Sequence, residues 1–160
     1  INKYSFSNIA IIDFDVHHGN GTQDIFYNNK NVSYYSTHQF PLYPGTGDLN
    51  ETGVGNIFNV PLVSGTSSDI YKNLFQEKII NQLKIQKPDF MIISAGFDAH
   101  SADPLANINL VEKDFSFITD QLKIIANNCC EGRLLSMLEG GYDINALEQS
   151  ILNHIKILQT

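Results

Sequence analysis

Five short apolar segments, separated by stretches of helical periodicity, constrain the fold of this chain more than any other feature of its sequence. Each segment is typical of a buried strand, and they span residues 9–16, 32–37, 57–62, 90–95 and 134–138. The apolar spacing between them predicts a helix over about residues 68–83, with Ser67 or Ser68 as its N-cap. It also predicts two further helices. The apolar face of the first comprises Val111, Phe115, Ile118, Leu122 and Ile125. The second follows a cap at Asp143, and its apolar face comprises Ile144, Leu147, Ile151, Ile155 and Leu158. Strands that alternate with helices predict an α/β fold, in which a parallel sheet carries helices on both faces.

The length and composition suit a globular domain and weigh against several classes of protein. A chain of 160 residues fits one domain, and its 17 acidic and 10 basic residues give a formal net charge of -7. Because nucleic-acid phosphates attract basic surfaces, this balance argues against direct binding to nucleic acid. The apolar runs are much shorter than the roughly 20 residues of a membrane-spanning helix, so no membrane partner is expected. Cys129 and Cys130 are adjacent and cannot link distant segments, which favours a reduced, cytoplasmic protein.

Polar and chemically reactive side chains follow four of the predicted strands at their carboxyl ends. These are Asp15, His17 and His18; Ser36 and His38; Asp98 and His100; and Glu139, Gly140, Gly141 and Tyr142. In open parallel sheets, binding sites form outside the carboxyl ends of the strands, so we expect these groups to converge on one rim. This convergence indicates that the chain is an enzyme or belongs to one.

The first strand carries the strongest indication of a metal site. Alternation along a strand would place Asp13, Asp15 and His17 on one face, opposite a face of apolar residues. Three ionisable groups there are costly to bury unless a partner such as a cation compensates them. Zinc binds carboxylate oxygen and imidazole nitrogen and uses three protein ligands in catalytic sites, so Asp98 is the natural third ligand. In the competing interpretation, backbone amides merely satisfy these side chains, but Asp98 and the glycine-tyrosine loop favour the metal.

Several blocks of the sequence resemble one family of enzymes. Residues 13–23, Asp-Phe-Asp-Val-His-His-Gly-Asn-Gly-Thr-Gln, resemble the zinc-binding signature of histone deacetylases and their bacterial amidohydrolase relatives. The resemblance continues, in the order and at the intervals typical of that family, at residues 36–39, 43–47, 94–100, 103–104 and 138–142. Asn20 and the Glu-Gly-Gly-Tyr form of the last block are closer to class II and bacterial members than to class I.

The resemblance implies a partial arginase–deacetylase fold and the zinc-dependent hydrolysis of an acetylamide, on acetyl-lysine, an acetylpolyamine or a related amine. By position, Asp15, His17 and Asp98 match the zinc ligands of the family. Tyr142 matches the tyrosine that donates a hydrogen bond to the developing oxyanion. A phenol suits that task because it donates without ionising at neutral pH.

The same resemblance implies a substrate channel and a second ion. Tyr43 matches an aromatic wall of the channel, and Gly141 would let its loop approach the ligand closely. The residues that match a structural potassium site are Asp13 and Ser36, with the backbone carbonyls of Asp15, His17 and Thr37.

The general base of the family has no counterpart in this sequence. The family carries a tandem histidine pair on an earlier loop, whereas the adjacent pair His17-His18 belongs here to the metal motif. The upstream strands of the fold also lack a counterpart. We therefore expect residues 1–160 to be a single partial deacetylase catalytic domain whose N-terminal portion is missing. Such a segment should be inactive alone and should expose sheet surface.

Two other functions compete with this interpretation. An arginase-like ureohydrolase would bridge two manganese ions, but Gly19 and Asn20 follow the histidine pair and Asp98 lacks a companion Asp-x-Asp. A second metal would therefore be short of ligands. A non-catalytic acetyl-lysine-binding or scaffold module would be favoured by loss of the tyrosine or of a zinc ligand, yet all are present. Of the remaining residues, we expect His154 to be an ordinary helix residue and Asp103 to brace a loop.

Overall fold

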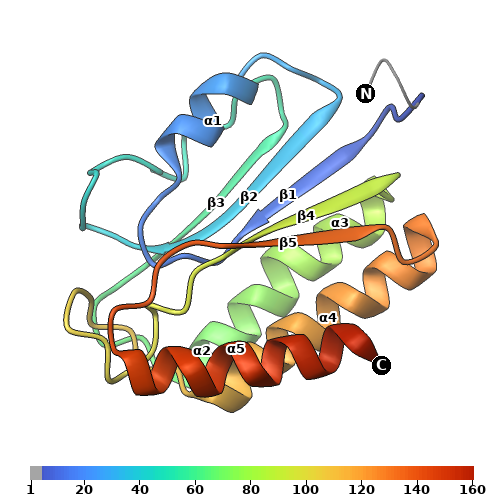
Figure 1. Ribbon diagram of the computed structural model, residues 1–160. Coiled ribbons are helices and arrows are strands. Elements are labelled where there is room, and N and C mark those ends of the chain that lie inside the picture. The colour runs from blue at the N-terminus through green and yellow to red at the C-terminus, as the bar shows by residue number, and fades with distance from the viewer. Residues whose placement is uncertain (1–4) are drawn as a thin grey trace.

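The computed structural model describes residues 5–160, in which five parallel strands form one sheet with helices on both faces (Figure 1). The strands are β1 (Ile9–Asp13), β2 (Val32–Gln39), β3 (Ile57–Leu62), β4 (Phe90–Ala95) and β5 (Leu134–Leu138), in the spatial order β3-β2-β1-β4-β5. All five predicted strands are present and the predicted fold class is confirmed. Only the ends of β1 and β2 differ from the predicted boundaries, β1 being shorter and β2 longer.

The helical segments are α1 (Asn20–Phe26), α2 (Ser68–Leu74), the π-helical turn η1 (Phe75–Ile80), α3 (Asn81–Gln86), α4 (Glu112–Cys130) and α5 (Ile144–Gln159). The three predicted helices are present, the first of them as the continuous run from α2 to α3. The predicted apolar face of the last helix is wrong in part, because Ile144 and Ile155 are 79% and 44% exposed. The residues that α5 buries instead are Ala146, Ser150 and His154. Asp143 caps α5 as predicted, since its carboxylate accepts a 2.8 Å hydrogen bond from the Ala146 N–H. Ser67 occupies the cap position of α2, but its side chain makes no capping bond. No helix within residues 5–160 is both long and apolar enough to cross a membrane.

The two faces of the sheet are covered unequally. Helices α2 to α5 lie together on one side of the sheet in Figure 1, and the main apolar core lies between them and the strands. On the other side, α1 packs against β2 over a smaller apolar cluster. Leu135 and Met137 of β5 point to this second side, because Ser136 between them contacts His154 of α5. They are 48% and 54% exposed, and we call the part of this side formed by β4 and β5 the open face.

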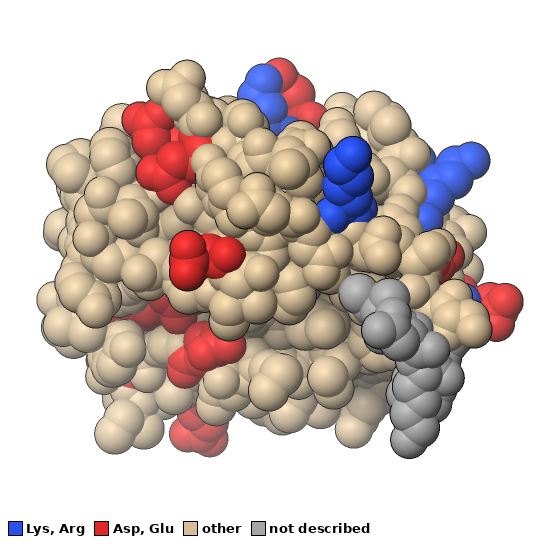
Figure 2. Space-filling view, turned by 90° about the horizontal axis from the view of Figure 1, so that it is seen from above, with Lys and Arg blue, Asp and Glu red and all other residues tan. Residues whose placement is uncertain are grey.

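The strand order places a crevice at the carboxyl ends of β1 and β4. The chain runs outward from β1 through β2 to β3, and then returns to the other side of β1 for β4 and β5. Such a reversal separates the loops that follow the two central strands and opens a binding crevice between them. Figure 2, which looks onto the side that carries α1, shows acidic side chains gathered toward the carboxyl ends of the strands and basic side chains toward the opposite end. The crevice therefore opens at the acidic end of the molecule.

Candidate metal centre

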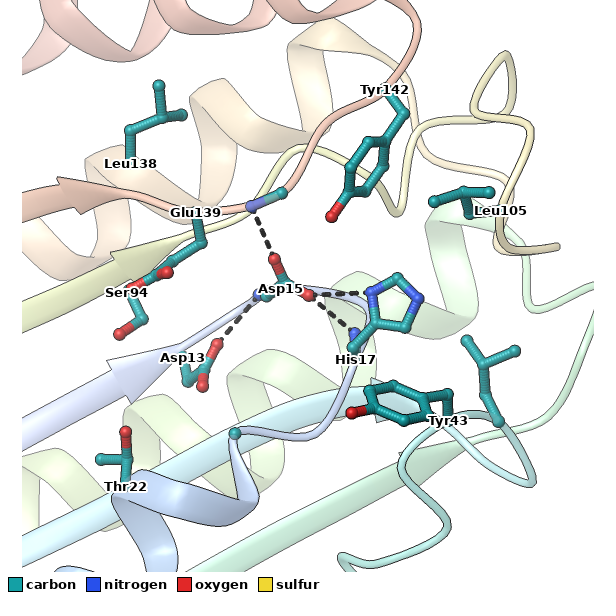
Figure 3. A pocket seen from close by; sticks show the side chains of 13 residues that line it. Asp13, Asp15, His17, Thr22, Tyr43, Ser94, Leu105, Leu138, Glu139 and Tyr142 are labelled. Atoms are coloured by element: carbon teal, nitrogen blue, oxygen red, sulfur yellow. Dashed lines mark hydrogen bonds and ion pairs between the residues drawn. The ribbon is translucent and has the colours of Figure 1, made fainter.

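A cavity of about 700 Å³ opens at this crevice (Figure 3). Its walls come from the segments that follow β1 and β5, from the end of β4, and from two loops that carry apolar residues at the rim. The residues named by the sequence pattern that line it are Asp13, Asp15, His17, Tyr43, Glu139, Gly140 and Tyr142. Asp98 lies beneath this surface, fully buried, and its carboxylate contacts His17.

The strand β1 ends at Asp13, earlier than the predicted boundary of Val16, and yet Asp13, Asp15 and His17 line one cavity. Asp13 Oδ1 accepts a 3.1 Å hydrogen bond from the Asp15 N–H, and Asp15 Oδ1 accepts a 2.8 Å bond from the His17 N–H. Aspartates that bind the N–H two residues ahead form local turns, which here replace the strand ladder. Phe14 and Val16 stay buried on the opposite side, so the alternation continues after sheet pairing has stopped.

Asp15, His17 and Asp98 form the group that the sequence predicted as metal ligands. One potential ligand atom from each residue lies within 4.8 Å of the other two. The His17 Nδ1 lies 3.2 Å from Asp15 Oδ1 and 3.0 Å from Asp98 Oδ2, so both carboxylates face the same ring nitrogen. Within residues 5–160, this is the one group of histidine, cysteine and acidic side chains close enough together to hold a metal ion.

Backbone N–H groups hold both carboxylates in place. Asp98 accepts a 2.8 Å hydrogen bond from the Val16 N–H through Oδ1, which leaves Oδ2 facing His17. Asp15 accepts a 2.8 Å bond from the Gly140 N–H through Oδ2. Outer contacts of this kind fix the direction of the ligand atoms in metal sites. The group therefore joins the segments that follow β1, β4 and β5.

Electrostatics favour a positive charge at the centre of this group. Hydrogen bonds to Asp15 and Asp98 raise the pKa of His17 to about 10. Burial raises the pKa of Asp98 to about 6, against the opposing effect of the bond with His17. For Asp15, burial acts to raise the pKa, but hydrogen bonds from His17 and Gly140 outweigh it and lower the pKa. Two carboxylates that hold an imidazolium this firmly would attract a divalent cation in the same way.

The Tyr142 phenol points toward the metal group from the loop that follows β5 (Figure 3). Burial, together with the charge of Asp98, raises the pKa of Tyr142, so its hydroxyl keeps its proton at neutral pH and remains a donor. Tyr43 lies on another side of His17 and lines the cavity with a largely exposed ring. The cavity thus has a hydrogen-bond donor and an aromatic wall around one potential metal position.

Gly140 comes closest to the metal group, whereas Gly141 packs against α5. A Cβ atom at Gly140 would collide with the carboxylate oxygens of Asp15 and Asp98. At Gly141, where φ is 142°, a Cβ would lie 2.6 Å from Leu147. The close approach of Gly141 to a substrate stays a prediction. Within the chain, Gly140 makes the close contact with the metal group, and its N–H is bonded to the Asp15 carboxylate.

The residues expected around a potassium ion lie at neighbouring strand ends. Asp13 is buried, accepts a 2.8 Å hydrogen bond from the Tyr34 hydroxyl, and has its pKa raised by burial. Ser36 pairs with Asp13 across β1 and β2, and its hydroxyl lies 2.8 Å from the His38 Nδ1. The Thr37 hydroxyl is bonded to a buried tyrosine. The potassium site stays a prediction.

Histidines His18, His38 and His100 are held by the framework around the site. The His18 Nδ1 lies 2.7 Å from the Thr46 hydroxyl. Burial lowers the pKa of His38 to about 4, and its Nε2 lies 3.0 Å from a backbone carbonyl. His100 Nδ1 accepts a 3.0 Å bond from the Ala102 N–H. None of the three lines the cavity formed by the described residues.

Comparison with known proteins shows the family to which this sequence belongs. A sequence model of the histone deacetylase domain matches residues 1–158. The chain belongs to the histone deacetylase family. It is 39% identical over 94% of its length to "Histone deacetylase 10, chloroplastic" of Oryza sativa subsp. japonica. It is 42% identical over 89% of its length to "Probable deacetylase" of Archaeoglobus fulgidus.

Solved histone deacetylase structures share the fold of this chain. The crystal structure of the HDA15 HD domain matches 98% of the chain with a TM-score of 0.90 and 38% identity. The structure of the histone deacetylase Clr3 matches 96% of it with a TM-score of 0.89 and 30% identity. The predicted arginase–deacetylase fold is thus confirmed as a partial domain. The chain spans 35% of the rice protein, 41% of the Archaeoglobus protein and 46% of the HDA15 chain.

Proposed function

We propose that this chain forms the metal-binding and oxyanion-stabilising part of a zinc-dependent deacetylase, which hydrolyses an acetylamide of lysine or a related amine. One convergence carries the proposal. The His17 Nδ1 faces the carboxylates of Asp15 and Asp98, and the Tyr142 phenol points toward the same centre. Membership of the histone deacetylase family supports the same chemistry.

The donor set of this group fits zinc. Catalytic zinc sites accept carboxylate oxygen and imidazole nitrogen, and three protein ligands leave a position for water or substrate. The imidazole of His17 favours zinc over magnesium, which prefers oxygen ligands. Bound zinc would polarise the acetyl carbonyl group and lower the pKa of a bound water molecule.

The side chains of the chain itself would place the acetylamide and stabilise its charge. The Tyr142 hydroxyl would donate a hydrogen bond to the carbonyl oxygen as negative charge develops there, and its raised pKa keeps the donated proton in place. Leu42, Tyr43 and Leu105 line the cavity and offer apolar walls to an aliphatic chain. The acidic end of the molecule in Figure 2 would attract a substrate that carries positive charge nearby.

We further propose that additional polypeptide of the same protein supplies the general base and covers the open face. His17 is the histidine that lines the described cavity, and it belongs to the metal group. The relatives are more than twice as long as the matched part, and Leu135 and Met137 leave apolar area uncovered. We therefore expect the 160-residue chain alone to hydrolyse acetyl-lysine no faster than background.

The alternatives have less support from the described side chains. A dimanganese ureohydrolase needs a second set of ligands, whereas residues 5–160 bring together one such group. A non-catalytic acetyl-lysine-binding module would keep the cavity without turnover, but the contact between His17 and Asp98 and the direction of the Tyr142 phenol support turnover. We also propose that potassium binds beside Asp13 and Ser36 as a structural ion.

Zinc content and turnover of the full-length protein test the main proposal together. We expect elemental analysis to find about one zinc ion per polypeptide, and a chelator to abolish hydrolysis of an acetyl-lysine peptide. Asp98→Asn removes a charged ligand at constant size. It should weaken zinc binding by more than the roughly 10–100-fold that follows loss of an outer partner. Tyr142→Phe should keep its zinc and lose about 100–1000-fold in kcat, the cost of one oxyanion donor.

Asp114→Asn is the matched control for the ligand variant. Asp114 is also fully buried and hydrogen-bonded, but it lies at the start of α4, where it contacts Ser68 and Val111. We expect this variant to keep its zinc. Unchanged zinc content in Asp98→Asn would remove Asp98 from the ligand set, and full turnover by Tyr142→Phe would remove the phenol from the mechanism.

A further inference from the structure

We propose that Asp103 is a positioning residue for the catalytic phenol, because its carboxylate fixes the backbone of Tyr142 and ties it to Leu105 at the rim of the cavity. The proposal rests on the proposed deacetylase function, in which Tyr142 donates to the oxyanion. It gives a role in catalysis to a buried carboxylate that lies outside the metal group.

The position of Tyr142 is set by its backbone more than by its side chain. The side chain is 54% exposed, and Figure 3 shows the ring extending into the cavity. The Tyr142 N–H donates a 2.7 Å hydrogen bond to Asp103 Oδ2. Within the described chain, this is the hydrogen bond that holds the residue. The direction of the phenol therefore depends on the peptide group that Asp103 binds.

The segments on both sides of Tyr142 are anchored, and a glycine lies between. Upstream, the Gly140 N–H is bonded to a ligand carboxylate and its carbonyl oxygen accepts a 2.7 Å bond from the loop after β4. Downstream, Asp143 caps α5. Gly141 has a φ of 142° and links these anchors with a conformation that restricts other residues more than glycine. Without Asp103, the Tyr142 backbone could rotate about Gly141 while the metal group stayed intact.

Asp103 is itself firmly held and contacts two residues of the cavity. It is 7% exposed, and its Oδ1 accepts a 2.9 Å hydrogen bond from the Leu105 N–H. Its own N–H donates a 2.9 Å bond to the His100 carbonyl oxygen. Both carboxylate oxygens thus accept from backbone donors, and the two residues they bind, Leu105 and Tyr142, line the same cavity. The Asp103 side chain therefore fixes the backbone positions of both Tyr142 and Leu105.

The donor pattern around Asp103 requires a carboxylate. Both partners are N–H groups, and an ionised carboxylate accepts through both oxygens. Asparagine offers one acceptor oxygen and would turn its NH₂ group toward the second N–H, so it could keep only one of the two bonds. We therefore expect Asp103→Asn to have an effect intermediate between those of the native residue and Asp103→Ala.

The test measures kcat and KM of the full-length protein on an acetyl-lysine peptide, with Asp103→Ala in the native and the Tyr142→Phe backgrounds. In the native background, we expect kcat to fall by about tenfold to 100-fold, because a displaced catalytic group loses activity steeply, while KM changes by less than about threefold. In the Tyr142→Phe background, the further loss should be less than about twofold, since the group that Asp103 positions is already removed. An equal loss of kcat in both backgrounds would overturn the proposal.

Hydrogen exchange at the Tyr142 amide provides a readout that does not need turnover. We expect Asp103→Ala to speed exchange at this amide and to leave zinc content unchanged. Unchanged exchange would overturn the positioning role even if activity fell. Absence of turnover in the native protein would instead count against the deacetylase function, and the exchange result would still test Asp103.

Asp89→Ala is the matched control for Asp103→Ala. The Asp89 carboxylate also accepts hydrogen bonds from two backbone N–H groups, those of Ser7 and Asn8, each at 2.9 Å. It lies just before β4, at the opposite end of that strand from the cavity. We expect its substitution to leave kcat and exchange at Tyr142 unchanged. A tenfold fall in kcat with Asp89→Ala would mean that any lost loop anchor lowers activity, which would overturn a specific role for Asp103.

Discussion

On the side of the sheet that α2 to α5 cover, side chains such as Phe115 and Ile93 are completely buried, whereas on the open face Leu135 and Met137 are 48% and 54% exposed. The difference lies in what covers them, because the chain folds its own long helices onto the first side only. The first side is therefore a completed core, while the open face leaves apolar side chains uncovered.

The cavity lies where these two sides meet. Asp15, His17 and Asp98 follow strands whose side chains, such as Ile12 and Ile93, belong to the completed core. Asp13 and Ser94, which also line the cavity, are paired residues of β1 and β4 and share the side that carries the open face. The completed side thus positions the metal group and the phenol, and the unfinished side is where the remaining catalytic groups would enter.

The largest difference between the two sides should appear when a core aromatic is removed. Phe115 has ring contacts with Phe14 and Phe97, and its truncation leaves a cavity in a closed core. We expect Phe115→Ala to lower the free energy of unfolding by about 3–5 kcal/mol in chemical denaturation. Leu135→Ala in the 160-residue chain is the control and should cost less than about 1 kcal/mol. Equal losses would mean that the two sides are equally packed.

A pH effect of intermediate size should come from His154 in the completed core. Its ring lies between the hydroxyls of Thr119 and Ser136, and burial lowers its pKa to about 4 from 6.5. The unfolded chain therefore takes up the proton first as the pH falls. The contribution to stability is fully present above about pH 6.5 and is lost as the pH approaches 4, by on the order of 2–3 kcal/mol.

Denaturation of His154→Gln alongside the native protein isolates this effect. The pH dependence of the unfolding free energy between 6.5 and 4 should become shallower in the variant, because glutamine does not titrate. The histidines His18 and His38, whose pKa values are also lowered, contribute equally to both proteins and cancel in the difference. Identical slopes in the two proteins would show that the pKa of His154 does not differ between the folded and the unfolded state.

The smallest effect should come from the open face, and it should depend on which form of the protein is measured. In the 160-residue chain, Met137→Ser should change the unfolding free energy by less than about 0.5 kcal/mol and reduce self-association in light scattering. In the full-length protein, the same change should cost more than about 1 kcal/mol, because the side chain would then be covered. No difference between the two forms would mean that the open face stays exposed in the whole protein.

The elements of the completed side could be predicted from the sequence because burial leaves a periodic signal, although the face that α5 buries, with Ser150 and His154, was not the predicted one. Helix α4 buries Phe115, Ile118, Leu122 and Ile125 at the spacing that the sequence shows. Helix α1 could not be predicted in this way, since Gln23 is its only buried residue among seven. The end of β1 was placed too late because, after the turn at Asp13, buried residues still alternate with partly buried ones although sheet pairing has stopped.

The candidate site could be predicted where its residues are close together in the sequence, and less well where residues far apart in the sequence are in contact. Asp15 and His17 could be predicted from their spacing after one strand and Asp98 from its place after another, and the family resemblance added the role of Tyr142. The contacts of Asp103 could be anticipated only as a loop brace, because its bond to Tyr142 joins residues 39 positions apart. That bond depends on how β4 and β5 align, which no local pattern encodes.

Asp98 and His17 are separated by 81 positions along the chain, and they meet because β4 inserts beside β1. Before that insertion, a growing or partly unfolded polypeptide offers a metal ion only two of the three proposed ligands, Asp15 and His17. Tight binding of the proposed zinc ion would then come late, after the central strands have docked, and the bound ion would oppose their separation by mass action. Zinc uptake during folding would therefore report when β4 has paired with β1.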